Sequence, residues 1–186
     1  MHRTAAALAV ALVLAGPARA AEVAKVQVPD QATVAGRALV LNGAGLRSRA
    51  IFKVYVASLY VTARTSDPQA VLASVPRRVQ LDLLRNLSAA QLVDALEDGL
   101  KANNSPAELD AVKPQVEELA RIMRGFGEVR EGSVVTLDYA DAVTSIGLGG
   151  AARGTIPGEA FNRALLRVWL GDHPVQGDLK KAMLGG

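Results

Sequence analysis

The fold of this chain is constrained most by a strand-like pattern of apolar residues that is followed directly by a helix-like one. Residues 78–85 alternate between apolar and polar side chains, at Val79, Leu81 and Leu83 against Gln80 and Asp82. A period of two is typical of a half-buried strand. Behind Ser88, a favourable helix N-cap, the apolar residues return at helical spacing, at Leu92, Val93, Leu96 and Leu100.

The same signals predict the remaining elements. Strands are expected over 50–62, 133–139, 142–148 and 153–156, with a short strand inside 21–30, and helices over 68–74, 107–124, 159–170 and 178–184. Pro114 is expected to divide or kink the helix over 107–124. Along the chain, a group of strands is followed by helices, then by more strands and more helices. This order favours an α+β fold in which helices cover an antiparallel sheet.

Glycines mark the predicted turns. Asn42-Gly43 is a turn pair, so the stretch GAGLR (43–47) is expected to be a tight turn that ends at Arg47. The glycine-rich run SIGLGGAARGTIPG (145–158) contains no lysine, which a phosphate-binding loop would need. A hairpin between strands is therefore expected there.

The beginning of the chain has the composition of a secretory signal peptide. Met1-His2-Arg3 is basic, Ala5 to Ala15 is an apolar run too short to span a bilayer, and Ala18-Arg19-Ala20 has the small-x-small form of a cleavage site. We expect a signal peptide over 1–20 and one domain over 21–186. This predicts a periplasmic or secreted protein with no membrane span after cleavage, and the alternative is a retained N-terminal anchor.

Charge and composition exclude several functions. The chain has 21 basic and 18 acidic residues, and the predicted signal peptide holds two of the basic ones, so the remaining chain has a net charge of +1. It has no basic cluster, and aromatic residues make up only 4% of the chain, so nucleic-acid binding is not expected. The absence of cysteine excludes thiol catalysis and thiolate metal sites.

Few residues apart from Arg47 are candidates for a catalytic or metal-binding role. His173 follows a predicted helix end, where a lone histidine is more often a partner of the helix dipole than a base. The carboxylates Glu117, Glu118, Asp138 and Asp141 are expected on solvated faces rather than around a metal. We predict no metal and no cofactor.

Arg47 allows two interpretations from the sequence. A charged residue after Gly-Ala-Gly is usually a solvated turn residue. However, Tyr55 lies eight residues later, inside an otherwise apolar predicted strand. Its hydroxyl could therefore point inward toward the same place as the guanidinium.

Four stretches resemble the chalcone isomerase superfamily. LNGAGLR resembles that family's glycine-rich turn with a ligand-site arginine, and FKVYVASLYV resembles the strand that follows it. TSIGLGGAARGTIP resembles its late hairpin, and LLRVWLGDHPVQGDLKKAML its late helix. The resemblance covers about residues 25–184. It implies an open-faced β-sandwich, a large antiparallel sheet wrapped by helices with a cleft between them.

The resemblance also implies site residues. Arg47 matches the family's ligand-binding arginine, whereas the plant enzyme's other polar residues fall at Tyr55, Gln91, Asp98 and Val168, the last beside Trp169. An acidic Asp98 and an apolar Val168 are unsuited to stabilising negative charge during ring closure. The resemblance therefore implies that efficient chalcone isomerisation is not expected.

The pair of Arg47 and Tyr55 instead resembles the carboxylate-holding pair of the superfamily's fatty-acid-binding branch. The first hypothesis is an exported protein that binds a fatty acid or similar amphiphilic carboxylate at Arg47, Tyr55, Gln91, Asp98, Val168 and Trp169. The alternative is an isomerase of the intramolecular lyase type, with Arg47 as electrophilic stabiliser and Tyr55 as general acid. A third is a non-catalytic envelope protein that binds a partner. The oligomeric state stays open.

Overall fold

The structure is a computed structural model that describes residues 21–186. The predicted signal peptide, 1–20, lies outside the described residues. The strands are β1 (Ala21–Val23), β2 (Val26–Val28), β3 (Gln31–Val34), β4 (Arg37–Arg49), β5 (Phe52–Val61), β6 (Arg77–Leu83), β7 (Leu87–Ser88), β8 (Glu128–Val129), β9 (Val134–Ala140), β10 (Val143–Leu148) and β11 (Ala151–Pro157). The helices are α1 (Pro68–Ala73), α2 (Ala89–Asn103), α3 (Pro106–Ala111), α4 (Lys113–Arg124), α5 (Glu159–Leu170) and α6 (Gly177–Met183).

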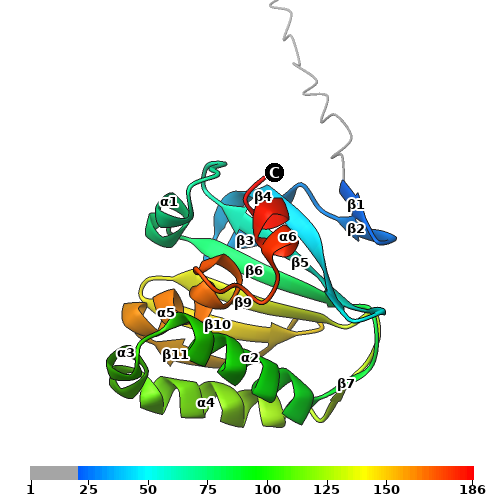
Figure 1. Ribbon diagram of the computed structural model, residues 1–186. Coiled ribbons are helices and arrows are strands. Elements are labelled where there is room, and N and C mark those ends of the chain that lie inside the picture. The colour runs from blue at the N-terminus through cyan, green and yellow to red at the C-terminus, as the bar shows by residue number, and fades with distance from the viewer. Residues whose placement is uncertain (1–20) are drawn as a thin grey trace, which may run out of the picture.

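One antiparallel sheet organises the described part of the chain. Its seven strands run in the order β11-β10-β9-β6-β5-β4-β3, and every neighbouring pair is antiparallel. Helices α2, α4 and α5 gather on one side of this curled sheet, and α6 packs near β4 (Figure 1). The predicted α+β fold is confirmed.

The core has one part on each face of the sheet. Along β5, the side chains of Ala57, Leu59 and Val61 belong to the large apolar cluster under the helices. Val56 and Tyr60 face the other way, into a smaller cluster that the β1–β2 hairpin helps to cover. Because β5 is apolar on both faces, it is a central strand rather than a half-exposed one.

Most of the predicted elements are confirmed. The β6 strand buries alternate residues as its period of two predicts. Ser88 caps α2 in a capping box with Gln91, and the predicted second helix is divided at Val112, with Pro114 in the first turn of α4. The glycine-rich run forms the β10–β11 hairpin. Within residues 21–186, no helix is both long and apolar enough to cross a membrane.

The predicted turn at Asn42-Gly43 is wrong. Strand β4 continues through these residues to Arg49, with an irregularity in its pairing between Leu41 and Gly43. The chain reverses at Ala50, which has a positive φ of 52°. The side chain of Asn42 is buried and donates to the carbonyl oxygens of Thr65 and Met183.

The glycines of this strand are required for helix packing. A Cβ atom on Gly43 would lie 2.0 Å from the carbonyl oxygen of Ala182, and one on Gly45 would lie 2.7 Å from the Cβ of Ala182. Helix α6 therefore lies directly against the backbone of β4, at a separation that only glycine permits.

A buried arginine connects α1 and α5 to the sheet. Arg77 is 2% exposed. Its guanidinium donates to the carbonyl oxygens of Leu72 and Ser74 and to Oδ1 of Asn162, and it stacks 4.3 Å from the centre of the Tyr139 ring. Burial lowers the pKa of Arg77 to about 10, which still leaves it charged at neutral pH. The helix ends therefore depend on a cation that has no carboxylate partner within residues 21–186.

Gly45→Ala should destabilise the protein by about 1–3 kcal/mol, because the added methyl forces α6 away from β4. The measurement is the free energy of unfolding in urea. The matched control is Gly177→Ala in α6, where an added Cβ meets nothing within 4 Å and alanine favours the helix. Equal stability of Gly45→Ala and the wild type would contradict close packing as the reason for this glycine.

Arg77→Ala should cost about 3 kcal/mol, because it leaves one buried acceptor and two partly buried acceptors without a donor. Its neighbour Arg78 is the control. Arg78 lies on the opposite face of β6, in a bidentate pair with Asp138 in which each side chain is 20% exposed, so Arg78→Ala should cost about 1 kcal/mol. Urea denaturation of both variants measures the loss in free energy of unfolding. Equal losses would contradict the argument that the greater burial of Arg77 makes it the more important of the two.

Candidate functional site

Arg47 and Tyr55 lie directly opposite each other in the β4–β5 ladder. Opposed residues of an antiparallel pair project from the same face of the sheet. Tyr55 packs against the large apolar cluster, so this is the helix-covered face. Both side chains are half-buried. The two residues that the sequence placed eight positions apart are therefore neighbours, because the chain reverses between them.

The Tyr55 hydroxyl is positioned by Trp169 of α5. Nε1 of Trp169 donates to the hydroxyl oxygen at 3.1 Å, and the indole is 1% exposed. Burial raises the pKa of Tyr55, an effect that the Trp169 hydrogen bond and the charge and hydrogen bonding of nearby Arg47 oppose only in part. The phenol therefore keeps its proton at neutral pH. Since its oxygen is already an acceptor, its O–H remains available to donate to a ligand.

The Arg47 guanidinium is held on one side only. Nη1 donates to the carbonyl oxygen of Ser48 and, at 3.3 Å, to Oε1 of Gln176. Within residues 21–186, neither Nε nor Nη2 makes a hydrogen bond of good geometry, although the guanidinium lies close enough to the Tyr55 hydroxyl to lower the pKa of that phenol. These two nitrogens form the side-on fork that matches a carboxylate. The arrangement presents two parallel N–H groups in a fixed direction.

Gln176 is a site residue that the sequence prediction missed. It immediately precedes α6. Its Oε1 also accepts from the backbone N–H of Ser48 at 3.0 Å, and its Nε2 donates to the carbonyl oxygen of Leu46 at 3.2 Å. The amide thus connects the start of α6 to the strand that carries Arg47. A polar residue before a helix was the available signal, but its meaning depends on which strand that helix covers.

The other predicted site residues lie elsewhere. Val168 is buried against Gly99 of α2. The contact is so close that a Cβ atom added to Gly99 would lie 2.7 Å from Cγ1 of Val168. Gln91 is exposed, and its side chain accepts from the backbone N–H of Ser88. Asp98 is exposed, and within the described residues no hydrogen bond or ion pair connects it to Arg47. The structure joins Trp169 to Arg47 and Tyr55, but not these three.

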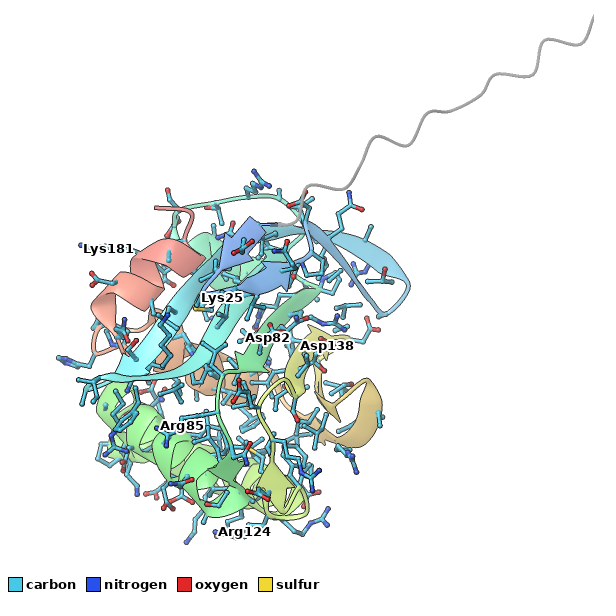
Figure 2. The ribbon with its side chains drawn as sticks, turned by 90° about the vertical axis from the view of Figure 1, so that its right-hand side faces the viewer. Lys25, Asp82, Arg85, Arg124, Asp138 and Lys181 are labelled. Atoms are coloured by element: carbon cyan, nitrogen blue, oxygen red, sulfur yellow. The ribbon has the colours of Figure 1, made fainter. Side chains whose placement is uncertain are left out.

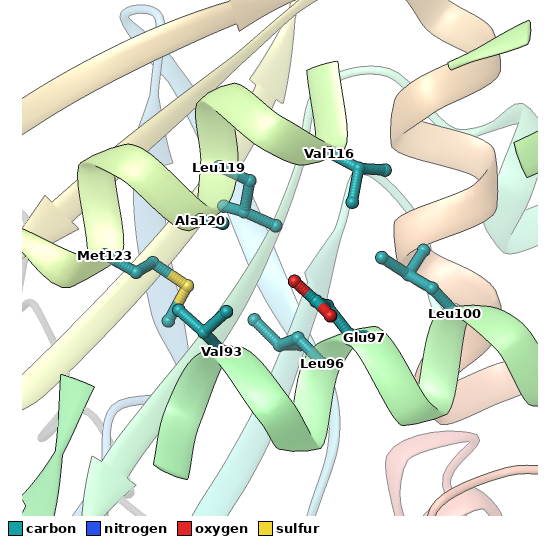
Figure 3. A pocket seen from close by; sticks show the side chains of 8 residues that line it. All are labelled: Val93, Leu96, Glu97, Leu100, Val116, Leu119, Ala120 and Met123. Carbon is teal, nitrogen blue, oxygen red and sulfur yellow. The ribbon is translucent and has the colours of Figure 1, made fainter. Parts of the chain in front are cut away.

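An apolar crevice lies between α2 and α4. Seven apolar side chains and the carboxylate of Glu97 line it (Figure 3), namely Val93, Leu96, Leu100, Val116, Leu119, Ala120 and Met123. Its volume is about 10 Å³, enough for one water molecule. Its buried residues belong to the same apolar cluster that Tyr55 and Trp169 contact. The crevice is therefore lined by the same apolar cluster that the arginine site contacts, but it is too small to hold a ligand.

A larger cleft of about 590 Å³ lies near the ends of α2 and α5. Its polar groups largely bond to one another. Arg167 donates to Glu108 and Asn104, Asn103 bonds the backbone of His173, and Lys180 donates to the carbonyl oxygen of Gly171. Within residues 21–186, no group of three histidine or acidic residues could hold a metal.

Comparisons with known proteins agree with this architecture. A fatty-acid binding protein of Arabidopsis thaliana has a similar structure, with a TM-score of 0.62 at 12% sequence identity, over 83% of this chain and 95% of that one. No curated protein sequence matches. The model of the family described as chalcone isomerase-like matches residues 20–185. By this match over nearly its whole length, the chain belongs to the chalcone isomerase-like family.

Proposed function

We propose that this protein binds a fatty acid or a similar amphiphilic carboxylate, whose head group is held by Arg47 and Tyr55. The observation that carries this proposal is that, among residues 21–186, the Nε and Nη2 fork of Arg47 has no carboxylate or carbonyl partner and lies beside a neutral phenol that accepts from Trp169. The guanidinium N–H groups and the phenol O–H are donors directed at the same place. Such a set favours an anion with two acceptor oxygens.

The apolar tail would supply most of the affinity. A hydrogen bond to a charged group contributes roughly 1.5–3 kcal/mol, whereas about ten buried CH₂ groups contribute roughly 8 kcal/mol before ordering costs. The tail would extend from Tyr55 into the apolar cluster between the sheet and α2, α4 and α5. Ligand pockets usually measure roughly 300–1,000 Å³, so binding requires the α2–α4 crevice to open.

The fold of the Arabidopsis thaliana fatty-acid binding protein supports this proposal as an analogy. The isomerase alternative has less support from the site. A general acid at neutral pH needs a pKa near 7, and burial moves the pKa of Tyr55 in the opposite direction, above its usual value of 10. A group that holds its proton is suited to donating a hydrogen bond rather than transferring a proton.

We also propose that the protein acts outside the cytoplasm, on the composition of residues 1–20. N-terminal sequencing of the protein from its native host should give a chain that begins at Ala21.

Arg47→Ala should weaken laurate binding at least tenfold, because it removes the charged donors from the head group. Tyr55→Phe should weaken it less, since the guanidinium remains. The measurement is calorimetric titration of delipidated protein. Arg37→Ala is the matched control, since it changes an exposed arginine at the other end of β4. An absence of saturable laurate binding by the wild type would reject the proposal, as would unchanged affinity in Arg47→Ala.

Gln176→Glu should also weaken laurate binding at least tenfold. The new carboxylate lies where Oε1 already accepts from Arg47 Nη1, so it neutralises the guanidinium and competes with the ligand. Gln69→Glu is the control, because it adds the same charge to an exposed side chain in the first turn of α1. Affinity equal to that of the wild type in Gln176→Glu would place the carboxylate of the ligand away from Arg47.

A further inference from the structure

The tip of the β4–β5 hairpin exposes two large apolar side chains. Ile51 is 89% exposed and Phe52 is 53% exposed. The remaining large apolar residue with comparable exposure within residues 21–186 is Val75, at 39%. The hairpin ends at the right-hand edge of the molecule in Figure 1. Two adjacent apolar residues therefore form a projecting tip rather than part of a groove.

Basic side chains surround this tip. Arg49 and Lys53 flank it on the two strands, and both are exposed. Exposed Arg85, which follows β6, places its guanidinium 4.8 Å from the centre of the Phe52 ring, and Figure 2 shows Arg85 beside the end of the hairpin. Residues 47–54 contain three basic residues and no acidic residue. The tip is thus apolar at its end and positive behind it.

We propose that this hairpin tip docks on the surface of an anionic lipid bilayer, with Ile51 and Phe52 inserted at the level of the headgroups. Apolar side chains in front of a basic ring match the two layers of such a surface, where headgroup charge lies outside the acyl region. A protein partner is less suitable, because specific interfaces bury about 800 Å² on each side and a two-residue projection offers much less apolar area.

The tip lies next to the arginine site. Arg47 and Tyr55 are two and three residues from Arg49 and Phe52 along their strands. A docked tip would place Arg47 near the bilayer surface, where a fatty acid would enter or leave. The docking itself does not depend on the proposed function, since it needs no fatty acid and no residue of the head-group site.

Vesicle sedimentation tests the proposal. The wild type should bind vesicles of phosphatidylcholine and phosphatidylglycerol (3:1) and should bind pure phosphatidylcholine much less. Binding should weaken as salt increases. Ile51→Ser with Phe52→Ser should lower the partition coefficient at least tenfold. Arg49→Glu with Lys53→Glu should lower it by a similar factor, since one basic residue near an anionic surface contributes roughly fivefold.

The controls match each change elsewhere on the surface. Val75→Ser removes an exposed apolar side chain, and Lys113→Glu with Arg153→Glu reverses two exposed basic residues on α4 and β11. Both should bind within twofold of the wild type. Each variant is tested in the full chain and in a chain that begins at Ala21, because the apolar run 5–15 could itself bind vesicles. Circular dichroism checks that the variants fold.

A second measurement reports the depth of the tip. Phe52→Trp places an indole at the tip, and its emission should shift to shorter wavelength with anionic vesicles but not with pure phosphatidylcholine. The wild type gives the background emission of Trp169, which is buried and should not respond to vesicles. The proposal is overturned if the wild type does not sediment with anionic vesicles at low salt. It is also overturned if the tip variants bind as the wild type does, or if the Phe52→Trp emission does not shift.

Discussion

The contact of α6 with the backbone of β4 is the constraint on which the candidate site depends. Two glycines on one face of the strand, Gly43 and Gly45, remove the side chains that would otherwise hold the helix away. Because the helix lies this close, the residue before it, Gln176, reaches Leu46, Arg47 and Ser48 at the same time. The position of the guanidinium is therefore set by helix packing as much as by the strand that carries it.

Two arginines on the helix-covered side of the sheet show how environment decides the role of one residue type. Arg77 is buried, its two terminal nitrogens bond to protein oxygens, and its plane rests on an aromatic ring. It stabilises the junction of α1, α5 and β6. Arg47 is half-buried, and its hydrogen bonds of good geometry within residues 21–186 are both made by Nη1. Its remaining donors give it the capacity to bind an external anion.

The sequence predicted the regular elements well because their signals are local. The alternation in β6, the capping box of Ser88 and Gln91, and the glycine after α5 each act within a few residues. The Asn42-Gly43 prediction failed for a physical reason, since glycine serves equally at a tight turn and at a close approach of two backbones. Local sequence does not distinguish these two uses, because the second depends on a helix distant in the chain.

The sequence by itself determined most of the strands and helices, though not β3 and β4, together with a break in the second helix just before Pro114. It also showed an arginine and a tyrosine close to each other in the chain. The tertiary structure alone decided that Trp169 holds the tyrosine hydroxyl and that Gln176, 129 residues from Arg47, occupies one side of the guanidinium. It also placed Gln91 and Asp98 at the surface and Val168 against α2. The reason is that periodicity and capping are interactions between near neighbours, whereas a binding site is formed by the register of strands and the packing of helices that the chain brings together only when it folds.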